Sequence, residues 1–252
     1  MTNKFIANVD YIYSKQEDYI ANPKDQFKTI LKWIRDNVNT QSQKSYDLID
    51  LGCARGELLY FLKNNLSDVK FNFVGIDCSK KITDLARENH EDDVLFFEAD
   101  VEDWNDLKEK APLALNKKYD FLTILGVVEY FDFPDKVIKN IHSMLKDGGR
   151  AIIINILNEY DIDVRVRYRN NEYFSDFRKG WSLHSLKTIR RLLKENNLKV
   201  HKSEKFFPER LTKPKEDPAR SWMVKMPTGE LKYRNGLSQL YDVYVLEVEK
   251  CM

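Results

Sequence analysis

The sequence contains little cysteine. Its 252 residues include three cysteines, Cys53, Cys78 and Cys251, which form no C-x-x-C pair and have no histidine near them as a partner. An odd number of widely spaced cysteines indicates free thiols rather than a disulfide framework. We therefore predict reduced cysteines and a cytoplasmic protein.

The sequence also lacks an excess of charge of either sign. Its 41 Lys and Arg residues balance 40 Asp and Glu residues, which leaves a formal net charge of +1. Broad nucleic-acid binding needs a basic excess on one face, so we predict no nucleic-acid partner. No apolar run approaches membrane-spanning length and the first residues have no signal-peptide core, so we predict no membrane partner either. Nothing in the pattern indicates an oligomeric state.

A short glycine turn between a strand and a helix lies in residues 46–62, YDLIDLGCARGELLYFL. The apolar run of Leu48, Ile49 and Leu51 predicts a buried strand, and residues 58–62 return to helical spacing. Between them, residues 52–56 read GCARG. Glycine has no Cβ and adopts positive φ, so such a turn lets the main chain approach a ligand at the start of the helix.

The spacing of this turn resembles the D-x-G-x-G-x-G signature of class I S-adenosylmethionine-dependent methyltransferases. Asp50 stands two residues before Gly52, and Ala54 replaces the middle glycine. The resemblance implies that Gly52, Ala54 and Gly56 surround the methionine part of S-adenosylmethionine, with Cys53 contributing mainly its main chain. The alternative is an ordinary strand-to-helix turn without a ligand.

Two acids follow the next two predicted strands. Asp77 ends the strand over residues 71–76, about 20 residues beyond the glycine turn, where doubly wound folds place an acid for ribose hydroxyls. The alternative role of Asp77 is at the start of the helix over residues 79–89. Asp100 follows the strand over residues 94–97, and the resemblance implies that it accepts from the adenine amino group while Val101 packs on the ring. Alternatively, Asp100 caps a helix over residues 102–110.

The fourth predicted strand, residues 119–125, leads into the longest familiar segment. Residues 126–156 resemble the methyltransferase pattern V-L-E-H…D-P…L-K-P-G-G-x-L-x-I, with Tyr130 where many members have His and Asp147 where Pro is usual. Gly148 and Gly149 are expected to end a helix in a sharp turn. The predicted cofactor-binding residues are Asp50, Gly52, Cys53, Ala54, Gly56, Asp77, Cys78, Asp100, Val101, Leu125 and Gly126.

The remaining pattern predicts an α/β fold: a Rossmann-like, seven-stranded, mostly parallel sheet with helices on both faces and an antiparallel last strand. Residues 1–45 are expected to form an N-terminal cap segment and a helix over 24–38. Residues 46–252 form the methyltransferase domain, with insertions at about 157–181 and 208–236. After the first insertion we expect a helix over 182–193 capped by Ser182, a strand over 199–207 and the last strand over 240–248.

Methyl transfer places few demands on catalytic side chains, because the sulfonium is an excellent leaving group and the protein mainly aligns the reactants. Glu129, Tyr130 and His184 are the candidates for a base or an acceptor anchor. Each has a plainer alternative: Glu129 binds cofactor or caps a helix, Tyr130 packs over the site, and His184 is structural within its helix. Tyr13 and Tyr19 are further candidates to close over the cofactor. The fourth-strand edge lacks clustered acids, so we predict no metal.

We expect the acceptor to be a small molecule, specifically a sugar or glycan hydroxyl, because the insertions are rich in tyrosine and arginine. Two rival functions remain. One is a cofactor-binding scaffold or partner subunit without turnover. The other is a nicotinamide-dependent oxidoreductase, whose G-x-G-x-x-G motif the glycine turn does not match.

Replacing Asp77 tests the predicted ribose contact. We expect Asp77→Ala to weaken S-adenosylhomocysteine binding by about 1–3 kcal/mol, because buried hydrogen bonds to a charged group are lost. Isothermal titration calorimetry measures the change. Wild-type affinity in this variant would return Asp77 to a role at the helix start.

Overall fold

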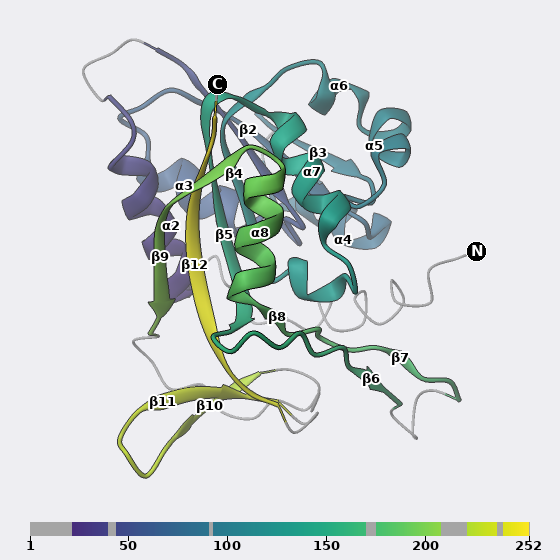
Figure 1. Cartoon of the computed structure of the whole chain (residues 1–252). Helices are drawn as coiled ribbons and strands as arrows, with labels where there is room; N and C mark the ends of the chain where they lie inside the picture. The colour runs from purple at the N-terminus through teal and green to yellow at the C-terminus, as the bar shows by residue number, and fades with distance from the viewer. Residues whose placement is uncertain are drawn as a thin grey trace.

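The computed structural model describes residues 22–39, 44–90, 93–169, 175–207, 221–235 and 239–251. Strands and helices alternate through most of the chain (Figure 1). The helices are α2 Asp25–Arg35, α3 Glu57–Asn65, α4 Lys80–Asn89, α5 Trp104–Lys110, α6 Pro112–Leu115, the 3-10 turn η1 Val128–Tyr130, α7 Asp135–Met144 and α8 Leu186–Glu195. The strands are β1 Tyr46–Leu51, β2 Phe71–Asp77, β3 Val94–Glu98, β4 Tyr119–Leu125, β5 Leu145–Asn158, β6 Arg167–Tyr168, β7 Arg178–Lys179, β8 His184–Ser185, β9 Leu198–Phe206, β10 Trp222–Lys225, β11 Leu231–Arg234 and β12 Leu240–Lys250.

The central sheet has the predicted Rossmann-like form. Its order runs β3-β2-β1-β4-β5-β12, and β9 pairs with the other edge of β12. The first five strands are parallel to one another, whereas β12 is antiparallel to both β5 and β9. The seven predicted strands are therefore all present. Within the described residues, β8, β10 and β11 extend the sheet to ten strands.

Two hydrophobic clusters cover the two faces of this sheet. Leu48 and Phe73 belong to the cluster that includes α2 and α3, and their neighbours Ile49 and Val74 belong to the cluster that includes α5, α7 and α8. This alternation follows from the strand geometry, in which successive side chains point to opposite faces. The predicted burial of both faces is confirmed, and it explains why the parallel strands are apolar along almost their whole length.

Three local predictions were wrong. α8 begins at Leu186 rather than 182, and its cap is Ser185, whose hydroxyl accepts the N–H of Thr188, instead of Ser182. His184 consequently lies in β8 and not in a helix. Helical periodicity alone does not distinguish two closely spaced serines as caps, since the choice depends on which one pairs with β5.

The two glycines after α7 also differ from their prediction. α7 ends at Met144, and β5 begins at once, so Gly148 and Gly149 lie within the first residues of the strand. The β4–β5 register shifts there, from Tyr119↔Leu145 to Phe121↔Arg150. A Cβ on Gly149 would come within 2.8 Å of the carbonyl oxygen of Tyr119, so the bulge requires glycine at this position.

Both predicted insertion regions contribute structure at the carboxyl edge of the sheet. The β6–β7 ribbon and the β10–β11 hairpin lie beyond the same end of the central strands (Figure 1). β8 pairs with Leu157 and Asn158 at the end of β5, and β11 pairs with the first residues of β12. The domain boundaries themselves remain a prediction, and Tyr13, Tyr19 and residues 208–220 lie outside the described residues.

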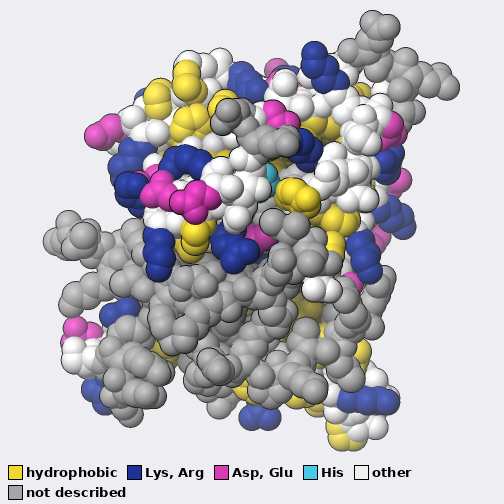
Figure 2. All heavy atoms as spheres, turned by 180° about the vertical axis from the view of Figure 1, so that it is seen from behind, with side chains coloured by type: hydrophobic (Ala, Val, Ile, Leu, Met, Phe, Trp, Pro, Cys, Tyr) yellow, Lys and Arg dark blue, Asp and Glu magenta, His cyan; other side chains and the backbone are white. Residues whose placement is uncertain are grey.

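Charge is dispersed over the described surface. Figure 2 shows Lys and Arg side chains interspersed with Asp and Glu on the reverse face, with no broad area of one sign among the coloured residues. One ion-pair network, at the amino edge of the sheet, pairs Lys146 with both Asp47 and Asp120. These ion pairs connect strands and do not form a basic surface.

Gly75 in the middle of β2 provides a test of the packing beneath the glycine turn. A Cβ there would meet Phe96 Cδ1 at 2.7 Å and Cys53 Sγ at 2.8 Å. We expect Gly75→Ala to lower the free energy of unfolding by about 1–3 kcal/mol through overpacking. Urea unfolding measures it, with Asn72→Ala at an exposed position of the same strand as the control. Equal stability of the two variants would contradict the packing described here.

Candidate active site at the carboxyl edge

The carboxyl ends of β1, β2, β3 and β4 meet at one edge of the sheet. Main-chain hydrogen bonds connect them: the N–H of Gly52 donates to Ile76 over 2.7 Å, and the N–H of Ala99 donates to Asp77 over 3.0 Å. In register, Asp77 lies opposite Glu98. Ligands of open α/β sheets bind outside this edge, near the switch in strand order between β1 and β4.

The turn after β1 has an unusual backbone. Gly52, Ala54 and Gly56 have φ values of 73°, 48° and 77°. A Cβ on Gly52 would lie 2.2 Å from Val127 Cγ2, so both the conformation and the packing demand glycine there. Ala54 adopts the left-handed region despite its methyl group, which costs about 1–2 kcal/mol. These three positive φ values turn the chain tightly from the end of β1 into the start of α3.

Asp77 joins this turn to the start of α4. Its Oδ2 accepts the N–H of Ala54 over 3.0 Å, and its Oδ1 accepts the N–H of Ser79, also over 3.0 Å. The cap of α4 is Ser79, whose hydroxyl accepts the N–H of Ile82. Asp77 thus connects the turn after β1 to the start of α4 through both of its carboxylate oxygens.

The side chains of Asp50 and Cys53 are buried beneath the turn. Asp50 is buried, and its Oδ1 accepts the hydroxyl of Thr123 over 2.7 Å. Burial raises the pKa of Asp50 to about 7. The thiol of Cys53 lies against Gly75, and burial raises its pKa above the ordinary value. Only the main chain of Cys53 is thus available at the turn.

The third strand end combines an acid with a packed valine. Asp100 is half-buried, and its Oδ1 accepts the N–H of Glu102 over 2.9 Å. The cap of α5 is Asp103, which accepts the N–H groups of Asn105 and Asp106, so the capping alternative for Asp100 does not hold. Val101 packs in the core cluster with α5 and α7.

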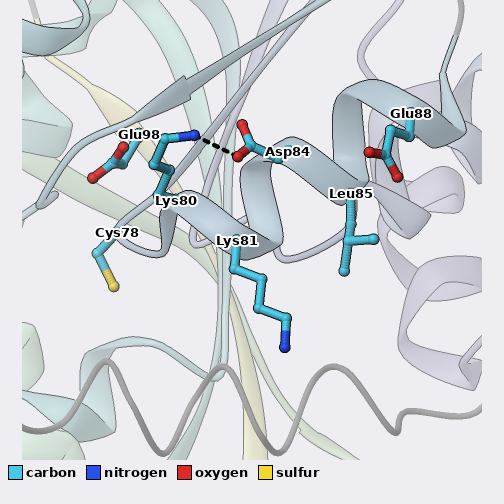
Figure 3. Close-up of a pocket in the computed structure, with 7 residues that line it drawn as sticks. All are labelled: Cys78, Lys80, Lys81, Asp84, Leu85, Glu88 and Glu98. Atoms are coloured by element: carbon cyan, nitrogen blue, oxygen red, sulfur yellow. Dashed lines mark hydrogen bonds and ion pairs between the residues drawn. The ribbon is translucent and has the colours of Figure 1, made fainter.

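A hollow of about 520 Å³ lies beside the ends of β2 and β3. Figure 3 shows Cys78 and Glu98 at one end of it, with α4 forming the other lining. Cys78 directly follows Asp77, and Glu98 precedes Asp100 by two residues. The lining residues are Cys78, Lys80, Lys81, Asp84, Leu85, Glu88 and Glu98.

Glu129 occupies the other side of the edge, on η1 after β4. Leu125 ends the strand, and Gly126 turns with φ 62°, where a Cβ would lie 3.3 Å from Glu129 Oε1. The carboxyl of Glu129 is buried, and its Oε2 has no hydrogen-bond partner among the described residues. Burial raises the pKa of Glu129 to about 8. An unpaired buried carboxyl is costly, which is typical of a functional site.

Tyr130 and His184 differ in their relation to this carboxyl. The ring of Tyr130 meets the ring of Trp181 edge to face, with centroids 6.5 Å apart. The Nε2–H of His184 donates to the carbonyl of Phe131 over 2.9 Å, and burial lowers the pKa of His184. His184 is therefore a neutral, hydrogen-bonded residue behind η1, which matches its structural alternative.

The structure adds residues that the sequence pattern did not identify. Thr123 binds Asp50, Asn155 accepts the N–H of Glu129 over 3.2 Å, and Ser182 donates its N–H to the carbonyl of Glu129 over 2.8 Å. No local motif marks these residues, because their partners lie 26 to 73 positions away in the chain or on separate insertions.

No described helix is both long and apolar enough to cross a membrane. No group of three or more His, Cys, Asp or Glu side chains in the described part of the chain has the arrangement of a metal site.

Residues 19–203 match the family model described as a methyltransferase domain. The match covers most of the chain and contains the glycine turn, Asp77, Asp100 and Glu129. The chain belongs to this family and is a class I S-adenosylmethionine-dependent methyltransferase. The predicted family, fold, enzyme class and cofactor are thereby confirmed.

Individual relatives are distant. A ubiquinone biosynthesis O-methyltransferase of Coxiella burnetii is 25% identical over 126 residues, which are 50% of this chain and 49% of the relative. The chain thus spans about half the length of the curated relatives it matches. An S-adenosylmethionine-dependent methyltransferase from Clostridium acetobutylicum superposes with a TM-score of 0.55 at 16% identity, covering 99% of both chains.

A second similar structure contains the cofactor. Magnesium protoporphyrin IX methyltransferase from Synechocystis with bound S-adenosylmethionine has a TM-score of 0.52 at 12% identity, over 99% of this chain and 91% of that one. At such identities the structural likeness establishes the fold. The acceptor and the roles of individual residues remain proposals.

The raised pKa of Glu129 predicts a pH-dependent stability. The pKa rises from 4.5 to about 8, so the folded chain keeps a proton that the unfolded chain releases. This contribution is complete below pH 4.5 and is lost as the pH rises to about 8, at up to about 1.4 kcal/mol per pH unit. Glu129→Gln cannot titrate, so its stability relative to wild type should increase across this window.

Urea unfolding at several pH values measures the difference between the two proteins. Glu88→Gln, which changes an exposed carboxyl of α4, is the matched control and should follow the wild-type curve. Parallel curves for wild type and Glu129→Gln would contradict a buried, protonated Glu129.

Proposed function

We propose that this chain transfers the methyl group of S-adenosylmethionine to a hydroxyl of a small-molecule acceptor. The observation that carries the proposal is the convergence of the glycine turn, Asp77 and Asp100 at one sheet edge. This convergence brings the glycine turn and two carboxylates to one place beside the switch in strand order, where an extended, polar ligand would bind.

The residues at this edge fit the cofactor. The positive-φ turn from Gly52 to Gly56, with no side chain at its two glycines, suits the methionine part, and the carboxylate of Asp77 suits the ribose diol as an acceptor. The carboxylates of Asp77 and Asp100 give this edge a negative character that suits a cationic ligand. When bound, the sulfonium supplies a methyl carbon that is already activated toward a nucleophile.

Glu129 is suited to receive the proton of the acceptor hydroxyl. A carboxyl with a pKa near 8 is a stronger base than an ordinary glutamate, and it is partly ionised near neutral pH. Its unpaired Oε2 is available to accept a hydrogen bond. Tyr130 and Trp181 present aromatic surface beside it, which suits an organic ring or a sugar face.

The acceptor class follows from the site and from the names of the relatives. The Coxiella relative is named as an O-methyltransferase of ubiquinone biosynthesis, and the Synechocystis protein acts on magnesium protoporphyrin IX by name. These names support small organic molecules and give no support to the predicted sugar or glycan hydroxyl. We therefore propose the broader class, a small molecule with a hydroxyl group.

Cofactor binding and turnover are tested separately. We expect calorimetry to show binding of S-adenosylhomocysteine and none of NAD, because the turn lacks the dinucleotide spacing. We expect labelled product after incubation of the protein with methyl-labelled S-adenosylmethionine and a deproteinised small-molecule extract. Binding without any labelled product would favour the scaffold alternative, and binding of NAD instead would favour the oxidoreductase.

Two glycine variants sharpen the binding experiment. Gly52→Ala places a Cβ 2.2 Å from Val127 Cγ2 at the proposed site. Gly148→Ala makes the same change at a nearly identical φ of 74°, with no atom within 4 Å. We expect at least a tenfold loss of S-adenosylhomocysteine affinity in Gly52→Ala, roughly 1.4 kcal/mol, and no loss in Gly148→Ala. Equal affinities would argue against the turn as the cofactor site.

A further inference from the structure

The main chain of Glu129 is attached on two sides to other parts of the fold. Its N–H donates to Oδ1 of Asn155 in β5, over 3.2 Å. Its carbonyl accepts the N–H of Ser182, the residue before β8, over 2.8 Å. The residue after it, Tyr130, packs edge to face on Trp181. Trp181 and Ser182 therefore contact the η1 turn that carries Glu129 from one side.

Trp181 is in turn hydrogen-bonded to Gln239, the residue that directly precedes β12. The side-chain amide of Gln239 donates to the carbonyl of Trp181 over 3.0 Å. The same amide accepts the Nδ2–H of Asn235 through Oε1 over 2.8 Å, and the N–H of Gln239 donates to Oδ1 of Asn235 over 3.2 Å. Asn235 is fully buried, so Gln239 is held at both its main chain and its side chain.

We propose that Gln239 is a positioning residue for the acceptor side of the active site. It holds Trp181, which with Ser182 holds the η1 turn that carries Glu129. We call the chain of contacts from Asn235 through Gln239 and Trp181 to Glu129 the latch. This inference rests on the proposed function for the role of Glu129, but the contacts of the latch are independent of it.

The physical reason for the latch is the unpaired carboxyl of Glu129. A buried carboxyl without a partner keeps its raised pKa only if its surroundings stay packed, because any opening lets water hydrate the charged form. η1 is a single 3-10 turn and cannot hold itself rigidly. The start of β12 also approaches Glu129 through the phenol of Tyr241, whose pKa is raised by burial and by the Glu129 charge.

The latch connects both insertion regions to one catalytic candidate. Trp181 and Ser182 end the region that contains β6 and β7, and Asn235 and Gln239 belong to the β10–β12 region. The hydrogen bonds and ring contact of the latch include no residue of the glycine turn. We therefore expect a change in the latch to alter the surroundings of Glu129 and to leave cofactor affinity unchanged.

Gln239→Met tests the latch, because it keeps the length of the side chain and removes both amide contacts. We expect the titration midpoint of the Glu129 carboxyl to fall by about one pH unit or more as water reaches it. Carbon-13 NMR of glutamate-labelled protein measures the midpoint, with the resonance assigned by its absence in Glu129→Gln. We expect affinity for S-adenosylhomocysteine to stay within about twofold of wild type.

Asn196→Ala is the matched control. Asn196 also donates a side-chain amide to a main-chain carbonyl, that of Leu192, over 2.9 Å, but at the opposite end of α8. Its loss should leave the Glu129 midpoint at the wild-type value. If Gln239→Met does not fold, Gln239→Asn shortens the same side chain and takes its place.

A wild-type midpoint for Glu129 in a folded Gln239 variant would overturn the proposal. So would an equal fall in Asn196→Ala, since the effect would then be unspecific. Failure of the wild-type protein to bind S-adenosylhomocysteine would instead count against the proposed function, and the titration would still decide whether the latch positions Glu129.

Discussion

The structure of the site depends on the two hydrogen bonds that Asp77 accepts from the main chain. One comes from Ala54 in the turn after β1, and the other comes from Ser79 before α4. They hold a strained turn, in which three alternate residues have positive φ, against the end of the neighbouring strand. A parallel sheet brings these two strand ends together only at its carboxyl edge, so the position of the site follows from the direction of the strands.

The two halves of the edge have different physical characters. On the cofactor side, the acids are partnered: Asp50 binds Thr123, Asp77 binds two N–H groups, and Asp100 binds Glu102. On the acceptor side, Glu129 is buried without such a partner. Carboxylates that already have hydrogen-bond partners are typical of a rigid binding site. A buried carboxyl oxygen without a partner is typical of a group that takes part in chemistry with a ligand.

The insertions complete the acceptor side. The family match ends at residue 203, before the β10–β11 hairpin begins. β10 and β11 therefore extend the sheet with chain beyond the matched region, at the start of β12. Additions at this edge leave the order and register of the central parallel strands unchanged.

The sequence by itself determined the alternation of strands and helices, the glycine turn and the acids at three strand ends. These features follow from local chemistry: apolar periodicity, the conformational freedom of glycine at Gly52 and Gly56, and the place of an acid after a strand. Local chemistry also explains Asn197 after α8, whose φ of 54° is a left-handed conformation that Asn tolerates better than most residues.

Tertiary structure alone decided the cap of α8, the bulge at Gly149 and the buried environment of Glu129. The cap depends on which serine pairs with β5, and the bulge depends on the register between β4 and β5. The environment of Glu129 depends on Asn155, Ser182 and Gln239, which are distant from it in the chain. Periodicity reports only local geometry, and the burial of a single carboxyl arises from contacts that no local pattern encodes.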